Sequence, residues 1–217
     1  MTRTGVKICG INDAACFDAV IEAGAAWIGF VFFPASPRYV SPAAARALSD
    51  RHHDAGQGGP ARVGLFVDPT EDAIAATLDQ VRLDVLQLYG RIPDIAALRA
   101  RFGLPLWRAV GVDRAEDLPV DSRGADRLLI EAKPPAGATR PGGNAVSFDW
   151  RVLRGWQAPV PWILAGGLTP DNVAAAIGET GARAVDVSSG VERSKGVKDP
   201  ALIRAFVRNA RDAFARG

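Results

Sequence analysis

Short runs of β-forming residues alternate with amphipathic stretches along this chain, and the alternation limits the choice of fold more than any other sequence feature. The runs are rich in Val, Ile, Leu and aromatic residues, as in strands buried on both faces. They predict strands at residues 6–11, 27–33, 62–67, 85–89, 106–110, 127–132, 162–165 and 184–188. A strand recurs roughly every 27 residues, a spacing typical of βα units and a parallel sheet. We therefore expect an α/β fold, a (β/α)8 TIM barrel with an eight-stranded parallel sheet, in which residues 1–217 form a single domain.

The stretches between the strands begin with recognisable helix starts. Residues suited to cap a helix N-terminus precede them: Asn12, Ser41, Thr70, Asp94 and Thr169. Proline follows Ser41 and Thr169, and proline is favoured at the first helical position. Residues 199–214 predict an amphipathic last helix, whereas residues 115–124 offer at most a short one. A doubly wound open sheet is the alternative, but no G-x-G-x-x-G follows the first strand, which weakens its dinucleotide-binding version.

Charge and cysteine content argue against several classes of protein. The net charge is only +2, and no basic run is interleaved with aromatic residues, so no nucleic-acid partner is expected. Cys9 and Cys16 lie in a strand-like and a helix-like segment, a pattern typical of reduced thiols in a cytosolic protein. The N-terminus lacks the apolar region of a signal peptide. The apolar run at 27–33 is far shorter than the roughly 20 residues that span a bilayer. We expect a cytoplasmic protein with no membrane partner.

The polar residues outside the strands suggest neither a metal site nor a cofactor. No cluster of His, Cys and Asp has the spacing of metal ligands. His52 and His53 come late in the second predicted helix, where a solvated surface pair is expected. The Gly/Pro-rich stretches 56–60 and 134–143 are predicted to be loops.

Several predicted strands carry polar residues at positions of the same parity, which in a barrel point to the interior. They are Lys7 and Cys9, Gln87, Glu131 and Lys133, and Asp186 and Ser188. Two cations and two carboxylates can neutralise one another there, so a structural layer of ion pairs is one interpretation, above all for Lys7. At the C-terminal strand ends a functional role is favoured, because barrel active sites lie on that face.

Two residues at strand ends have chemistry of their own. Cys9 ends the first strand; a lone cysteine in an apolar strand is ordinarily a small core residue, which is how we interpret Cys16 in the first helix. Arg38 follows the second strand after a proline, and arginine can hold a carboxylate with two parallel hydrogen bonds.

Two glycine-bearing turns predict a phosphate site. Gly166 and Gly167 lead from the seventh strand toward a helix start, and Ser188, Ser189 and Gly190 follow the eighth strand. Glycines let backbone N–H groups approach an anion, and the loops after strands seven and eight are the recurrent phosphate site of such barrels. The alternative for the Gly-Gly pair is a tight turn with no ligand.

Eight short motifs follow one another along the chain: KICGI at 7–11, GFVF at 29–32, SPRYVS at 36–41, GLFV at 64–67, QL at 87–88, FDW at 148–150, AGGL at 165–168 and DVSSGVE at 186–192. Taken together, these motifs resemble phosphoribosylanthranilate isomerases of tryptophan biosynthesis. They occur in the family's order and cover nearly the whole chain. The resemblance implies an enzyme, an isomerase that rearranges N-(5′-phosphoribosyl)anthranilate to an aminodeoxyribulose phosphate, acting as a monomer or homodimer on a small phosphosugar.

The resemblance also implies roles for individual residues. Cys9 is expected to be the general base and Glu131 the general acid, and Arg38 to hold the anthranilate carboxylate, with Asp186 lining the site. The phosphate is expected on the backbone of Gly166, Gly167, Ser188, Ser189 and Gly190. The base must be ionised and the acid protonated, which Lys7 beside the thiol and burial of the carboxyl would favour.

This chain departs from the family's pattern at three positions. Glu131 replaces the usual aspartate and moves the carboxyl one methylene further out, and Tyr89 replaces the usual histidine. Ala145 stands where a glycine is common. These differences concern efficiency more than identity.

Three competing functions remain to be weighed. The aminoaldose isomerase of histidine biosynthesis is expected to carry aspartate where this chain has Cys9. Ribulose-phosphate epimerases use metal-binding histidines that have no counterpart here. A non-catalytic phosphate-binding barrel would explain the two turns but not the pairing of Cys9 with Glu131.

Overall fold

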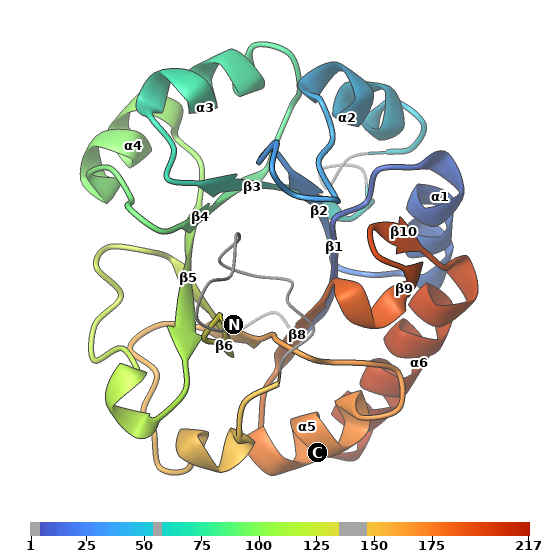
Figure 1. Ribbon diagram of the computed structural model, residues 1–217, viewed down its shortest axis with the longest axis vertical. Helices are drawn as coiled ribbons and strands as arrows, with labels where there is room; N and C mark the ends of the chain where they lie inside the picture. Colours follow the sequence, from blue (N-terminus) through green and yellow to red (C-terminus); the bar gives the residue numbers. More distant parts are fainter. Residues whose placement is uncertain (1–4, 54–57, 135–146) are drawn as a thin grey trace.

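Eight parallel strands close into a barrel, and the helices surround it (Figure 1). The computed structural model describes residues 5–53, 58–134 and 147–217. The strands are β1 (Gly5–Cys9), β2 (Trp27–Val31), β3 (Ala61–Val67), β4 (Val85–Tyr89), β5 (Leu106–Val112), β6 (Arg127–Ala132), β7 (Trp162–Leu164) and β8 (Ala184–Val187). Because β1 pairs with both β2 and β8, the sheet has no open edge. The predicted TIM barrel is confirmed, and the doubly wound open sheet is excluded.

The connections between strands are unequal in length and type. The part of the chain that the structure describes has six α-helices, the last of which follows the final barrel strand: α1 (Ala14–Ala23), α2 (Pro42–Ser49), α3 (Glu71–Leu78), α4 (Ile95–Phe102), α5 (Val173–Thr180) and α6 (Pro200–Arg216). Short 3-10 helices follow three strands: η2 (Ala115–Asp117) after β5, η3 (Trp150–Leu153) after β6 and η4 (Ser189–Val191) after β8. The prediction that residues 115–124 offer at most a short helix is thus confirmed. A small antiparallel hairpin, β9 (Glu192–Ser194) and β10 (Val197–Lys198), precedes α6 and was not predicted.

Helix caps follow the sequence at most positions. Ser41, Thr70 and Asp94 accept backbone hydrogen bonds at the starts of α2, α3 and α4, as predicted. Asp13, not the neighbouring Asn12, caps α1. The predicted cap at Thr169 is wrong, because α5 begins only at Val173. The backbone N–H of Thr169 donates instead to the side chain of Asn172, at 2.8 Å, so a turn rather than a helix follows the glycine pair.

Side chains fill the barrel interior in layers. The lower layer is apolar and includes two tryptophans that meet edge to face; its members are Trp27, Ala61, Val63, Val85, Trp107, Ile163 and Ala184. Nearer the C-terminal ends of the strands, Cys9 packs with Val31, Leu65 and Tyr89. The largest apolar cluster lies between the strands and the helices. Of the polar residues of the predicted parity, Lys7, Cys9, Gln87, Glu131 and Asp186 are buried above this apolar layer. The inward prediction is wrong for Lys133, because β6 ends at Ala132 and the exposed Lys133 side chain pairs with Asp117 of η2.

Some predicted features lie outside the described residues. They are residues 56–57 and 135–143 of the two predicted loops, and Ala145. His52 is on the surface as predicted, where its Nε2 lies 3.0 Å from Oδ1 of Asp18. Within the described part of the chain, no helix combines the length and the apolar character needed to cross a bilayer.

The last helix should contribute strongly to stability. α6 packs on α1, α5 and β1, and Phe206 on its buried face is 0% exposed. We expect Phe206→Ala to lower the free energy of unfolding by about 3–5 kcal/mol, measured by urea denaturation, because it leaves a cavity under the helix. Arg208→Ala, on the exposed face of the same helix, should change it by less than about 0.5 kcal/mol. Equal effects of the two substitutions would contradict this account of α6.

Candidate active site

A buried ion pair joins β1 and β8 inside the barrel. Nζ of Lys7, which is 0% exposed, lies 2.8 Å from Oδ1 of Asp186, its register partner on β8. Burial alone would lower the pKa of Lys7, but Asp186 and the sulfur of Cys9 raise it above its ordinary value. Lys7 therefore keeps its positive charge. The structural ion pair considered for Lys7 is present, and it lies directly beneath Cys9.

The thiol of Cys9 faces the barrel interior and not the helix layer. A Cβ built on Gly29, the register partner of Cys9 on β2, would lie 2.9 Å from Sγ of Cys9 and 3.1 Å from Nζ of Lys7. The thiol and the ammonium group thus meet over the bare Cα of Gly29. Burial raises the pKa of the Cys9 thiol, and Lys7 opposes that rise without cancelling it. The predicted cation is present, but burial outweighs it.

Glu131 faces the same interior from β6. It is only 6% exposed. Burial raises the pKa of its carboxyl to about 8, and the nearby Asp186 carboxylate adds to the rise, against the influence of Tyr89 and Lys7. Such a carboxyl is mostly protonated at neutral pH and can donate a proton. Because Asp186 also acts on the pKa of Cys9, one carboxylate lies within electrostatic reach of both candidate catalytic groups.

Tyr89 gives Glu131 a hydrogen-bonding neighbour. Nε2 of Gln87 donates to the Tyr89 hydroxyl at 3.2 Å, and the hydroxyl in turn interacts with the Glu131 carboxyl. Burial raises the pKa of Tyr89 well above its ordinary value, so the phenol stays neutral and retains its proton for donation. The sequence marked Tyr89 only as a departure from a family pattern. Tyr89 on β4 and Glu131 on β6 come into contact only across the closed barrel, so the sequence alone could not show this contact.

The two glycine-bearing turns lie in contact. Gly166 and Gly167 both have positive φ, 85° and 64°, which glycine adopts without strain. At Gly190, in η4, a Cβ would collide with the backbone oxygen of Leu168, so the turn after β8 packs directly on the turn after β7. Ser188 donates from Oγ to the backbone oxygen of Cys9 at 3.2 Å, which ties the second turn to the end of β1.

Arg38 is held beside the end of β1 and is not a surface residue. It is 3% exposed, and its methylene groups cover Gly10, where a Cβ would lie 2.9 Å from Cδ of Arg38. Nη2 of Arg38 donates to Oε2 of Glu192 at 3.0 Å, and Nε donates to the other carboxylate oxygen. The guanidinium is thus oriented by a further buried carboxylate, that of Glu192, to which the sequence assigned no role.

Lys198 completes what we call the buried ion cluster, formed by Arg38, Glu192 and Lys198. Nζ of Lys198 lies 2.8 Å from Oε1 of Glu192. Burial alone would raise the pKa of Glu192, but Arg38 and Lys198 hold it at about 2. Lys198 belongs to β10, in the hairpin that the sequence did not predict. Its neighbours along the chain give no sign of burial, so only the tertiary structure reveals it.

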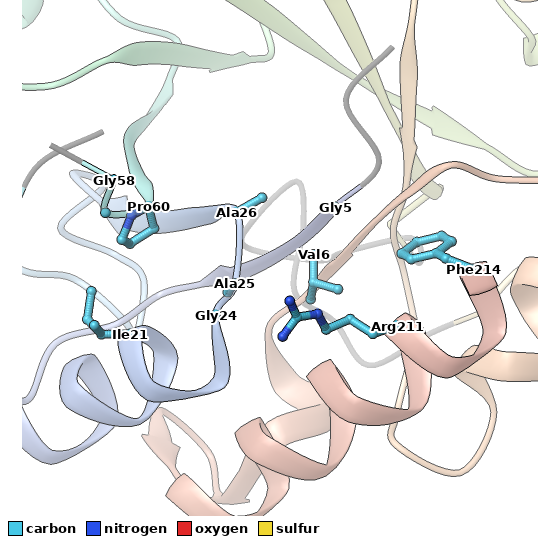
Figure 2. Close-up of a pocket in the computed structure, with 11 residues that line it drawn as sticks. Gly5, Val6, Ile21, Gly24, Ala25, Ala26, Gly58, Pro60, Arg211 and Phe214 are labelled. Carbon is cyan, nitrogen blue, oxygen red and sulfur yellow. The ribbon is translucent and has the colours of Figure 1, made fainter. Parts of the chain in front are cut away.

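The barrel has a pocket at the other end, away from these residues. It has a volume of about 430 Å³ and is lined by residues that precede or begin strands, such as Gly5 and Pro60, and by Arg211 and Phe214 of α6 (Figure 2). Cys9 and Glu131 stand at the C-terminal ends, where barrel enzymes carry their chemistry, so this pocket is not the candidate site. Among the described residues, no three His, Cys, Asp or Glu side chains gather in a way that could hold a metal ion.

Comparisons with known proteins agree on one family. Residues 6–209 match the family model described as N-(5′phosphoribosyl)anthranilate (PRA) isomerase. Over 207 residues the chain is 54% identical to N-(5′-phosphoribosyl)anthranilate isomerase of Acidiphilium cryptum (strain JF-5), covering 95% of this chain and 98% of that one.

Solved structures give the same result. One shows monomers of a dimeric phosphoribosylanthranilate isomerase from Thermotoga maritima, with a TM-score of 0.78, 34% identity, and coverage of 98% of this chain and 100% of that one. A second structure is of a phosphoribosylanthranilate isomerase in complex with reduced 1-(o-carboxyphenylamino)-1-deoxyribulose 5-phosphate. It has a TM-score of 0.78 and 33% identity, with coverage of 98% and 100%.

The raised pKa of Glu131 predicts a cost in stability at neutral and alkaline pH. A glutamate carboxyl ordinarily has a pKa of 4.5, which we take for the unfolded chain, whereas Glu131 has a pKa of about 8 in the folded protein. The stability linked to its proton is therefore fully present below about pH 4.5 and is lost as the pH rises through about 8.

Glu131→Gln removes this dependence of stability on pH. It should unfold in urea with a free energy higher than wild type by on the order of 1–3 kcal/mol at pH 8, and by much less at pH 5. An advantage of the same size at both pH values would contradict the raised pKa.

Proposed function

Because this chain belongs to the N-(5′-phosphoribosyl)anthranilate isomerase family of tryptophan biosynthesis, we propose that Cys9 is the base and Glu131 the acid of its isomerisation. The observation that carries the proposal is the burial of a thiol and a carboxyl in one barrel interior, on β1 and β6, with the pKa of the carboxyl raised by that burial. Two turns suited to phosphate lie at the same end of the barrel. The substrate would lie between these groups, anchored at its phosphate.

The first step opens the sugar ring. Glu131 donates its proton to the furanose oxygen while the bond from that oxygen to C1′ breaks. The anthranilate nitrogen supplies the electron pair, which leaves a cationic Schiff base between nitrogen and C1′. A carboxyl with a pKa of about 8 suits this step, because it is protonated near neutrality and acidic enough to give up its proton.

The second step moves hydrogen at C2′. The Cys9 thiolate takes the proton from C2′, and the electrons of that bond neutralise the Schiff base to give an enolamine. Tautomerisation then adds a proton to C1′ and removes one from the 2′-hydroxyl, which yields the ketone with no net gain or loss of atoms. Burial disfavours the thiolate. The Lys7 ammonium and the cationic Schiff base, both close to the sulfur in this scheme, offset that penalty.

The remaining residues would bind and orient the substrate. Arg38 would hold the anthranilate carboxylate, and its burial against Glu192 supports a preset orientation of the guanidinium. Asp186 would line the site next to Lys7. The phosphate would lie on the backbone N–H groups of the two turns, formed by Gly166 and Gly167 and by Ser188, Ser189 and Gly190.

We further propose that the protein acts on this small phosphosugar as a monomer or homodimer in the cytoplasm. Both cysteines, Cys9 and Cys16, are buried thiols, which suits a reducing compartment. A relative from Thermotoga maritima is described both as a dimer and as monomers derived from it. A phosphate-binding barrel without catalysis would bind the same ligand but show no turnover.

The test of the base is the removal of its sulfur. We expect Cys9→Ala to lower kcat by about 10²- to 10⁴-fold while leaving the affinity for the reduced reaction product nearly unchanged, because only the proton-accepting group is lost. The matched control is Cys16→Ala, which removes the other buried thiol, in α1, and should leave kcat near the wild-type value. Turnover by Cys9→Ala above about a tenth of wild type would remove Cys9 from the mechanism.

The contact between the two turns predicts that a side chain at Gly190 weakens phosphate binding. Gly190→Ala forces apart the turns after β7 and β8, because the new Cβ meets the Leu168 carbonyl. We expect KM to rise at least about tenfold, or roughly 1.4 kcal/mol, with a parallel loss of inhibition by inorganic phosphate. Gly178→Ala is the control, since a Cβ there meets nothing within 4 Å. A wild-type KM in Gly190→Ala would place the phosphate elsewhere.

A further inference from the structure

We propose that Lys198 is a positioning residue of the isomerase site, which holds the Arg38 guanidinium on one side and the Cys9 strand end on the other. The inference rests on the roles proposed above for Arg38 and Cys9. Lys198 itself would touch no reacting atom. It lies in β10, part of a hairpin outside the barrel, and its side chain reaches from there into the site.

The contacts of Lys198 use all three donors of its ammonium group. Nζ donates to Oε1 of Glu192 at 2.8 Å, to the backbone oxygen of Ser188 at 2.9 Å and to Oγ of Ser188 at 3.2 Å. The residue is only 2% exposed. Lysine is rarely buried unless its ammonium group is paired. Three acceptors around Nζ satisfy its three donors, so the contacts of Lys198 are those of a buried charged group and not of a surface lysine.

One branch of these contacts leads to Arg38. Glu192 takes the Lys198 ammonium on Oε1 and the Arg38 guanidinium on both oxygens, and the backbone N–H of Gly196 donates to Oε2 at 3.0 Å. Without Lys198, Glu192 keeps one cation and can shift toward it. Because Arg38 takes its orientation from this carboxylate, the carboxylate-binding guanidinium would shift as well.

The other branch leads to Cys9. Ser188 receives two hydrogen bonds from Lys198 and donates its own hydroxyl proton to the backbone oxygen of Cys9 at 3.2 Å. The ammonium group of Lys198 therefore fixes the turn after β8 against the end of β1. The same turn packs on Leu168 through Gly190. The contacts of Lys198 with this turn therefore affect the position of both proposed phosphate turns and of the Cys9 strand end.

Lys198 also contributes charge at the thiol. The charged or titratable groups that act on Cys9 are Lys7 on the same strand, Asp186 on β8, Tyr89 on β4 and Lys198. Lys7 and Lys198 lower the pKa of Cys9, whereas Asp186 raises it. The charged or titratable groups that influence the pKa of Lys198 are Glu192, Arg38 and Cys9. Lys198 in turn influences the pKa of Cys16 in α1. Loss of Lys198 should thus leave the thiolate of Cys9 harder to form.

The experiment compares Lys198→Met with Lys195→Met in the purified full-length protein. Lys195 is an exposed lysine in the same hairpin, so it controls for loss of a lysine from this segment. Two quantities are measured: kcat and KM for N-(5′-phosphoribosyl)anthranilate, and the rate at which iodoacetamide alkylates Cys9 as a function of pH, with the modified cysteine assigned by mass spectrometry. Burial raises the pKa of Cys16 to about 12, which keeps it from competing in the alkylation.

We expect Lys198→Met to lower kcat/KM about 100-fold, with KM raised, because a small displacement of Arg38 and of the Cys9 strand end suffices for such a loss. The alkylation curve of Cys9 should move to higher pH. Lys198→Arg, which retains the charge but not the three contacts, should restore the alkylation curve more than it restores KM. Lys195→Met should match wild type in every measurement. A purely structural role would lower thermal stability without moving the alkylation curve or KM.

A folded Lys198→Met protein with a wild-type KM and a wild-type alkylation curve would overturn the proposal. If Lys198→Met does not fold, Lys198→Gln replaces it, since it removes the charge and shortens the side chain but keeps an amide that can donate within the buried ion cluster, and Glu192 stays paired with Arg38. Its KM should still be raised, and a wild-type KM there would equally overturn the proposal.

Alkylation requires no turnover, so this test is separable from that of the proposed function. A wild-type protein without isomerase activity would count against the proposed function, while the dependence of the Cys9 alkylation curve on Lys198 would still stand or fall by itself.

Discussion

The ion pair between Lys7 and Asp186 crosses the seam at which the barrel closes, and the site is assembled around it. The two residues are 179 positions apart in the chain and 2.8 Å apart in space. Each charge would be costly to bury alone, but together they are tolerated in the interior. Their pairing places a cation under Cys9 and a carboxylate within electrostatic reach of Glu131. In a barrel with an apolar layer at this level, Cys9 would lack the Lys7 cation that opposes the rise in its pKa caused by burial.

Burial has opposite consequences for the two halves of the proposed reaction. It raises the pKa of Glu131 and so prepares an acid, and it raises the pKa of Cys9 and so hinders a base. Burial by itself therefore favours the protonated form of Glu131, and Asp186 adds to this, whereas a Cys9 thiolate depends on cations around it. Lys7, on β1 inside the barrel, supplies one cation, and Lys198, in the hairpin, supplies another. The Schiff base of the substrate would supply a third in the proposed reaction.

Close contacts at two glycine residues determine how near to one another the groups of the candidate site lie. Gly29 leaves the space in which the thiol meets the Lys7 ammonium, and Gly190 allows the turn after β8 to rest on the turn after β7. Both contacts depend on the absence of a Cβ rather than on any side-chain group. They bring Cys9, Lys7 and the two glycine-bearing turns close together at one end of the barrel.

The sequence by itself determined the barrel, the eight strands to within two residues at either end, and the inward parity of Lys7, Cys9, Glu131 and Asp186, because strand periodicity and turn residues act locally. It could not place the start of α5, where Asn172 binds the Thr169 N–H in a turn, nor the hairpin that carries Lys198. It also held no sign of the buried ion cluster or of the contact between Tyr89 and Glu131. Those features join residues distant in the chain, and their burial and charge balance exist only once the barrel has closed.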